Sequence, residues 1–295
     1  MQRVAVIGLG RMGQRIAGRL LEAKIEVSVY DVATDKARAL AGRGAHAAAS
    51  PKQAVEDADA AITMVTDGAA VLAALSGPQG LLAGARPGLL YVDMSTIGVE
   101  DSKRVAAACE AARVRYVRAP VLGTLPAVET GQLTALVSGP REAVDEATHL
   151  LAHLCGQQHY MGSAEEGRVA KLIVNGLLAA GLASLAEGLV VGQKMGLDWQ
   201  KLLEVVGGGA MASPAIKGSA QAIGQRNFEP RLSVDLLAKD LRLLAEAAML
   251  AGATVPIASA ALPLYQSAAN MGWGHLDTSA VFLLLETLAG KTVSE

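Results

Sequence analysis

Lys171 and Asn175 are the side chains whose type and spacing most clearly suggest chemistry. They lie four residues apart at the start of the longest apolar run in the chain, so in a helix they share one face. An ammonium beside an amide is costly to bury unless it lines a cleft. In a cleft the lysine could polarise a carbonyl oxygen and donate a proton to it. The alternative is a lysine that reaches solvent along its methylene chain.

The segment that must position this pair is a long helix. No residue from 172 to 186 ionises, but these 15 residues are fewer than the ~20 that a membrane helix needs. Glu187 and Lys194 follow on the same helical period. We therefore expect a buried helix over about residues 165–194 that links two domains.

The composition argues against several classes of protein. A length of 295 residues predicts about two domains. A net charge of -2 with 3% aromatic residues offers neither the basic surface nor the stacking platform of a nucleic-acid-binding protein. Cys109 and Cys155 lack metal-type spacing, so we expect no metal site and a reducing compartment. The first apolar run is too short for a secretory signal, which favours a soluble, cytoplasmic protein.

A glycine-rich turn near the N-terminus suggests a second kind of chemistry. The run at residues 4–7 is typical of a strand buried on both faces, and a helical pattern follows the turn. Gly8 permits a tight turn, Gly10 lets the backbone approach a pyrophosphate, and Gly13 lets the helix press on the strand. We expect the whole turn to bind the cofactor phosphates: Gly8, Leu9, Gly10, Arg11, Met12 and Gly13.

Asp31 indicates which dinucleotide binds there. It ends a second predicted strand, residues 26–30, and lies 21 residues after Gly10. A carboxylate at that place binds the ribose 2′-hydroxyl of NAD. Neither Val32 nor Ala33 supplies an arginine for the 2′-phosphate of NADP, so the sequence favours NAD over NADP. The alternative is a surface aspartate at a strand end.

Strands then alternate with helices, which predicts a parallel, doubly wound sheet of the Rossmann type. Ligands of such sheets lie beyond the carboxyl ends of the strands. The ends of the expected strands at 60–65 and 89–92 place four residues at the cofactor crevice: Val65, Thr66, Ser95 and Thr96. Further strands are expected at 114–117, 133–138 and 158–161, the last two on either side of a helix at 142–154. We assign this domain to residues 1–163.

The second half of the chain, residues 164–295, reads as an all-α domain. Its apolar residues recur at spacings of three and four, as in the segment 236–248. Lys239 and Asp240 interrupt that segment, either as an exposed charged face or as part of a site. Asp277 is a plausible N-cap of the last helix.

Five motifs, in order along nearly the whole chain, resemble those of the β-hydroxyacid dehydrogenases. That family includes 3-hydroxyisobutyrate dehydrogenase, tartronate semialdehyde reductase, and glyoxylate and succinic semialdehyde reductases. The motifs are the glycine turn, Asp93-Met94-Ser95-Thr96, Ala119-Pro120-Val121 with Gly131-Gln132-Leu133-Thr134, Gly167 through Lys171 to Asn175, and Lys239-Asp240. The resemblance implies a Rossmann-type parallel-sheet domain, a long linking helix and a helical domain, with a small-molecule substrate held between the two domains.

The resemblance also implies the roles of individual residues. Lys171 is the catalytic general acid and base in hydride transfer between the nicotinamide and a small β-hydroxyacid or semialdehyde, and Lys239 lies by the nicotinamide. The residues implied to bind substrate are Ser95, Thr96, Leu122, Gly123, Thr124, Asn175, Leu232 and Asp240. Leu122 stands where the family usually has serine, and Leu232 where an aromatic is common, so the expected pocket is more apolar than a glyoxylate-sized acid needs.

Two other functions remain open, together with the number of subunits. An imine reductase has a related fold and a less polar substrate, but typically replaces the lysine with aspartate or tyrosine. A non-catalytic dinucleotide-binding scaffold would be expected to lose the lysine or the glycines. The run 172–191 is apolar on nearly every side, which predicts a homodimer or homotetramer through the helical domain. The alternative is a monomer in which the last helices, 256–271 and 277–288, wrap the long helix.

Overall fold

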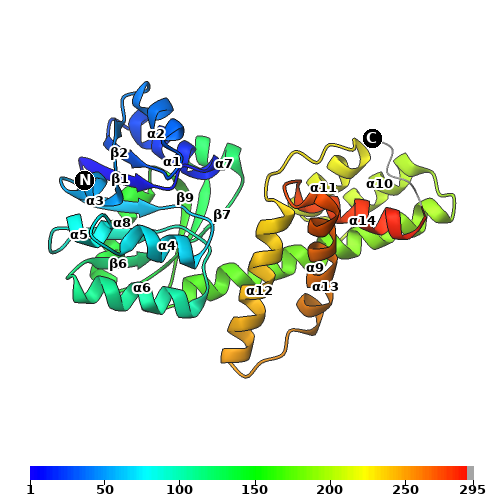
Figure 1. The fold of residues 1–295 in the computed structure, drawn as a ribbon. Helices are drawn as coiled ribbons and strands as arrows, with labels where there is room; N and C mark the ends of the chain where they lie inside the picture. Colours follow the sequence, from blue (N-terminus) through cyan, green and yellow to red (C-terminus); the bar gives the residue numbers. More distant parts are fainter. Residues whose placement is uncertain (291–295) are drawn as a thin grey trace. The chain divides into compact units, whose positions relative to one another are not determined.

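The computed structural model describes residues 1–290, which divide into two compact units. The first unit covers Met1–Lys171 and holds the sheet, and the second begins at Leu172 and is helical (Figure 1). The expected fold class, a Rossmann-type domain followed by an all-α domain, is confirmed. The predicted boundary at residues 163 and 164 lies just before helix α9 (Glu166–Lys194), and the two units divide within that helix.

The first unit is built on a nine-stranded sheet with the order β3-β2-β1-β4-β5-β6-β8-β7, and β9 also pairs with β8. The strands are β1 (Arg3–Ile7), β2 (Glu26–Tyr30), β3 (His46–Ala47), β4 (Ala60–Thr63), β5 (Leu90–Asp93), β6 (Arg115–Arg118), β7 (Val121–Leu122), β8 (Leu133–Ser138) and β9 (Cys155–Gly162). The prediction of a parallel sheet holds for most of it, but β8 runs antiparallel to both β6 and β7. The segment between β7 and β8 contains the short helix α7 (Leu125–Glu129), and it returns the chain antiparallel to β7.

The side chains of β1 pack alternately into two separate apolar cores, one on each face of the sheet. Val4 and Val6 belong to one apolar core, and Ala5 and Ile7 to another. Successive side chains of a strand point to opposite faces, so each core lies on its own side of the sheet. The helices of this unit are α1 (Arg11–Glu22), α2 (Thr34–Ala41), α3 (Pro51–Val55), α4 (Gly68–Leu75), α5 (Leu81–Gly84), α6 (Val99–Ala111), α7 (Leu125–Glu129) and α8 (Arg141–Leu151).

Several predicted ends are wrong by two or three residues. The predicted strand at 60–65 ends at Thr63, and the predicted helix at 142–154 ends at Leu151. The last strand begins at Cys155, three residues earlier than expected, because β9 pairs with β8 from Leu133 onward. Pairing with a neighbouring strand, which local pattern does not show, sets these ends.

The second unit packs around the buried face of α9. Its other helices are α10 (Trp199–Gly208), α11 (Pro214–Gly224), α12 (Val234–Leu250), α13 (Pro256–Ala268), η1 (Ala269–Trp273), η2 (Thr278–Ala280) and α14 (Val281–Leu288). Tyr265 is fully buried and donates its hydroxyl to the carbonyl of Ala179 on α9 at 2.9 Å. By length and mean hydropathy α9 could also cross a membrane. Leu172, Leu182 and Leu189 are nonetheless buried, as a core helix requires.

Candidate active site

The glycine turn connects β1 to α1 with the geometry that a dinucleotide phosphate needs. Gly8 has a φ of +93°, and its N–H donates to the carbonyl of Tyr30 at 2.9 Å. A Cβ at Gly13 would fall 1.9 Å from the carbonyl oxygen of Gly8. A Cβ at Gly10 would have no atom of residues 1–290 within 4 Å, so space is open beside the N-terminus of α1. Backbone N–H groups facing open space at a helix start suit a pyrophosphate, so these residues fit a dinucleotide.

Asp31 fixes this turn to the end of β2. One carboxylate oxygen accepts the N–H of Leu9 at 2.6 Å, and the other accepts the N–H of Ala33 at 2.8 Å. Lys36 approaches the second oxygen at 3.5 Å. Asp31 is buried, so it is not the loose surface aspartate of the alternative interpretation. The neighbouring Lys36 is a charge that our assignment of site residues left out.

The turns that follow β4 and β5 are bound to each other. Ser95 is fully buried, and its hydroxyl accepts the N–H of Val65 at 3.0 Å. Thr96, the next residue, is half-buried. Thr66 is exposed, and its hydroxyl donates to Asp67, the N-cap of α4, at 3.3 Å. The structure therefore brings Val65 and Ser95 together at the carboxyl ends of neighbouring strands.

The predicted substrate segment, Leu122–Thr124, joins β7 to α7. Gly123 has a φ of +134°, and a Cβ there would lie 2.7 Å from a methyl of Leu133. Leu122 is half-buried and pairs with Thr134 across the strands, while Thr124 is exposed at the start of α7. A positive φ is easily adopted only by glycine, so Gly123 is needed for the backbone to pass from β7 to α7 in this way.

The predicted polar residues of the second unit form a buried cluster. Asn175 donates its side-chain N–H to Asp240 at 2.5 Å, and Lys239 lies 3.0 Å from the other carboxylate oxygen of Asp240. Asp240 is 3% exposed, so the alternative of a charged surface face is wrong for it. Leu232 is half-buried and packs against the core of this unit. Lys171, half-buried, precedes Asn175 by four residues on α9.

Our sequence assignment missed a buried arginine close to Lys171. Arg168 is 1% exposed and lies 2.5 Å from Asp93, which ends β5. The motif that contains Lys171 also contains Arg168, but a charged residue at the start of a helix reads as solvent-exposed from sequence. Its partners come from β5, β6, α6 and the turn after β5, and only the fold reveals them.

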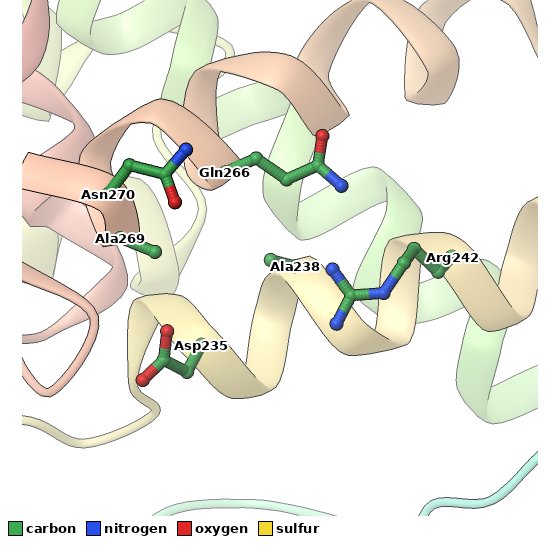
Figure 2. A pocket seen from close by; sticks show the side chains of 6 residues that line it. All are labelled: Asp235, Ala238, Arg242, Gln266, Ala269 and Asn270. Carbon is green, nitrogen blue, oxygen red and sulfur yellow. The ribbon is translucent and has the colours of Figure 1, made fainter.

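A separate groove lies on the helical unit. Figure 2 shows Asp235 and Arg242 on one helix, α12, facing Gln266 and Asn270 across an opening of about 440 Å³. Its described lining, completed by Ala238 and Ala269, includes none of the predicted site residues.

Two models of known protein families match nearly the whole chain. Residues 3–162 match the NAD-binding domain of 6-phosphogluconate dehydrogenase. Residues 166–285 match the NAD-binding domain of NADP-dependent 3-hydroxyisobutyrate dehydrogenase.

Individual relatives match over nearly their whole length. Glyoxylate/succinic semialdehyde reductase 1 of Arabidopsis thaliana is 31% identical, over 94% of this chain and 96% of its own. NAD-dependent L-serine dehydrogenase of Pseudomonas aeruginosa is 32% identical, over 99% and 100%. The structure of 3-hydroxyisobutyrate dehydrogenase of Mycobacterium tuberculosis has a TM-score of 0.87 at 32% identity, over 97% and 99%. An imine reductase from Pseudomonas sp. has a TM-score of 0.63 at 25% identity, over 96% and 99%.

Proposed function

Because the chain belongs to the β-hydroxyacid dehydrogenase family of NAD(P)-dependent oxidoreductases, we propose that Lys171 is the acid and base of its hydride-transfer reaction. The reaction interconverts the CH–OH group of a small hydroxyacid and the carbonyl of the matching semialdehyde or ketoacid. The observation that carries the proposal is the hydrogen bond from Asn175 to Asp240 at 2.5 Å. It joins two predicted site residues that are 65 positions apart, and Asn175 lies one helical turn after Lys171.

The nicotinamide, when bound, supplies or accepts the hydride. Lys171 handles the accompanying proton: as an ammonium it polarises the carbonyl and protonates the forming alkoxide. Oxidation of the alcohol requires the neutral amine. Asp240 orients the amide of Asn175 by accepting its N–H, so the amide oxygen of Asn175 is left to bind Lys171 or the substrate.

We place the cofactor on the first unit and favour NAD over NADP. The glycine turn binds the phosphates, and Asp31 accepts a ribose hydroxyl. The 2′-phosphate of NADP would approach the buried carboxylate of Asp31, and two negative charges repel each other. Val65, Thr66 and Thr96 lie toward the nicotinamide end, and Lys239 beside the ring completes the proposed set.

The proposed substrate is a small carboxylic acid with an apolar body. Backbone N–H groups at Gly123, with the hydroxyls of Thr96 and Thr124, would hold the carboxylate. Ser95 holds in place the turn that carries Thr96. Leu122 and Leu232 supply apolar surface where the family usually offers serine and an aromatic ring. The same two leucines favour, as a second candidate, an imine reductase acting on a less polar C=N or ketone substrate. Lys171 argues against that candidate, because the imine reductases typically lack the lysine.

Steady-state kinetics with a panel of substrates test the proposal. NADH oxidation would be followed with C2 to C5 semialdehydes, with 2-ketoacids and with cyclic imines, and NAD reduction with the matching hydroxyacids. We expect turnover of a semialdehyde or its hydroxyacid, and weak or no turnover of imines. Turnover of imines alone would establish the second candidate. NADH binding without any turnover would indicate a scaffold.

We also propose that the helical unit mediates assembly into a dimer or tetramer in the cytoplasm. Leu177 on α9 is 70% exposed, and Val191 on the same helix is also exposed. A matched pair of variants tests this: Leu177→Glu, and Val32→Glu at an exposed valine of the first unit. Light scattering should show an oligomer for the wild type and Val32→Glu, and a smaller particle for Leu177→Glu. A 30.2 kDa wild-type particle would contradict the proposal.

A further inference from the structure

Arg168 is a buried cation, and each of its three guanidinium nitrogens donates at least one hydrogen bond. Its Nε donates to the hydroxyl of Ser102 at 3.1 Å, and one terminal nitrogen donates to the carbonyl of Ser95 at 2.5 Å. The other terminal nitrogen donates to Asp93 at 2.5 Å and to the Tyr116 hydroxyl at 2.8 Å. A buried guanidinium is costly unless it is paired and hydrogen-bonded in this way. This cluster therefore has one well-defined arrangement.

The cluster holds both backbone groups of Ser95. Asp93 accepts the N–H of Ser95 at 3.0 Å, and Arg168 binds the carbonyl of the same residue. Asp93 is itself oriented by the hydroxyl of Thr63, at 2.7 Å. The Ser95 hydroxyl also accepts the N–H of Val65. The N–H, the carbonyl and the hydroxyl of Ser95 are therefore all hydrogen-bonded, which fixes the turn after β5. Thr96, next in the chain, takes its position from this arrangement.

Tyr116 adds no charge to this cluster, because its phenol stays protonated. Burial raises the pKa of Tyr116 to about 12, with Arg168 and Asp93 acting on it in opposite directions. The phenol is therefore protonated at neutral pH and accepts from Arg168 without adding charge. Its ring stacks on Tyr91, with centroids 5.3 Å apart, and the Tyr91 hydroxyl lies 2.7 Å from that of Thr63.

A separate contact holds the first turn of α9 against β8. Gly167 donates its N–H to the hydroxyl of Ser138 at 3.2 Å, and a Cβ at Gly167 would fall 2.4 Å from the carbonyl oxygen of Leu136. The helix start thus lies directly against β8. Lys171 follows Arg168 by three residues, less than one turn further along the helix.

We infer that Arg168 is a positioning residue, which sets the distance between Lys171 and the turn that carries Thr96. This inference rests on the proposed function, in which Lys171 handles the proton and Thr96 faces the cofactor and substrate. Catalysis by a fixed acid depends on its placement relative to the reacting carbon, and a misplacement of about 1 Å can lower the rate ~100-fold. Arg168 connects the helix that carries Lys171 to the turn that carries Thr96. Its backbone belongs to α9, and its guanidinium binds Ser95 and Asp93.

A second buried arginine provides the matched control. Arg118 pairs with Glu165 at 2.6 Å, and its guanidinium lies 4.5 Å from the ring centre of Tyr116. It therefore also attaches the chain just before α9 to the sheet, but through Glu165 and not through Ser95. Variants of Arg118 report the general effect of losing a buried ion pair at this place.

The experiment compares Arg168→Met with Arg118→Met, and Arg168→Lys with Arg118→Lys. For each variant we would measure Tm, Kd for NADH, kcat, KM and the primary deuterium isotope effect on hydride transfer. We expect all four to lower Tm. Well below Tm, Arg168→Met should lower kcat about 10- to 100-fold. Arg118→Met should change kcat less than about threefold, and Arg168→Lys should recover part of the loss, since an ammonium can bind Ser95 or Asp93 but not both groups in the same geometry.

The isotope effect and the binding constant separate positioning from stability. A displaced acid slows the chemical step, so the isotope effect of Arg168→Met should rise while Kd for NADH changes by only a few-fold. Equal losses of kcat in the Arg168 and Arg118 variants at equal Tm would overturn the inference, as would an unchanged kcat. Where a methionine variant does not fold, the two lysine variants decide by the same comparison. If Lys171→Ala keeps its activity while Arg168→Met loses it, the proposed role of Lys171 is wrong. The residue that Arg168 positions would then be a different one.

Discussion

Gly13 faces the carbonyl oxygen of Gly8 so closely that a Cβ at Gly13 would lie 1.9 Å from it. That distance is far below van der Waals contact, so α1 can press on the end of β1 only without a side chain there. Gly10, between them, differs: its Cβ would meet no atom within 4 Å in residues 1–290, and its φ of -64° suits any residue. We therefore expect the two glycines to be required for different reasons, Gly13 for folding and Gly10 for binding the cofactor.

This difference predicts opposite results for two alanine substitutions. Gly10→Ala should fold with a Tm close to that of the wild type and weaken NADH binding at least ~10-fold, because its methyl group would occupy the space of the pyrophosphate. Gly13→Ala should lower Tm strongly, because the helix must move away from the strand. Thermal unfolding and NADH fluorescence titration measure the two effects. A Gly10→Ala variant with unchanged NADH affinity would place the pyrophosphate elsewhere.

The contact between Asp31 and Lys36 makes cofactor choice testable within one site. We expect kcat/KM to be higher with NADH than with NADPH, because the Asp31 carboxylate accepts a ribose hydroxyl and repels a phosphate. Asp31→Ser should reduce this preference, since Lys36 would then be left free to attract the 2′-phosphate. Lys36→Ala in the same background should restore it. Equal or better efficiency of the wild type with NADPH would show that Lys36 outweighs Asp31.

Local sequence pattern predicted the glycine turn, the buried strands and α9, because each of these depends on residues close together in the chain. The strand β1, the turn and α1 occupy consecutive residues. The long apolar run, followed by Glu187 and Lys194 on the helical period, indicates α9 over nearly its full length. The same pattern could not show that β8 runs antiparallel to β6, because strand direction depends on where the chain returns to the sheet.

The hydrogen-bond network of Arg168 could not be predicted from the sequence either, because its partners are distant in the chain. Arg168 and Asp93 are 75 residues apart, and neither the helix start nor the strand end indicates that the other is its partner. Asp93 reads as the first residue of a motif and Arg168 as an ordinary surface charge. The two residues form an ion pair because the fold buries them side by side. Sequence pattern alone does not show that burial.

Asp277 predicts how the helical unit responds to acid. Burial by itself would raise its pKa, but hydrogen bonds from Arg231 and Ser279 hold the pKa below its ordinary value of 3.8. Asp277 accepts the N–H of Ser279 at 3.1 Å, so it caps the 3-10 turn η2, and α14, the last helix, follows directly with Ala280 at its own N-cap. Because the folded-state pKa is the lower one, ionised Asp277 stabilises the fold at pH values above 3.8. This contribution is lost as the pH falls through the folded-state pKa.

Asp277→Asn should therefore lower the free energy of unfolding by about 1.5–3 kcal/mol at neutral pH, the range for hydrogen bonds to a charged group. The difference from the wild type should shrink as the pH is lowered below 3.8. Urea unfolding at a series of pH values measures it. Asp57→Asn, at a carboxylate that is 82% exposed, is the control and should have little effect at any pH. A difference that stays constant down to strong acid would show that the charge of Asp277 is not responsible.

Lys171→Ala is the most direct test of the proposed chemistry. We expect kcat to fall by ~100-fold or more, the scale of lost general acid catalysis, while Kd for NADH changes little because the glycine turn and Asp31 remain intact. Lys194→Ala removes an exposed lysine at the other end of the same helix and should leave kcat unchanged. Kinetics and NADH titration on the three proteins decide the matter. If Lys171→Ala retains most of its activity, another group handles the proton, whereas a parallel loss in Lys194→Ala would point to a general effect of charge on α9.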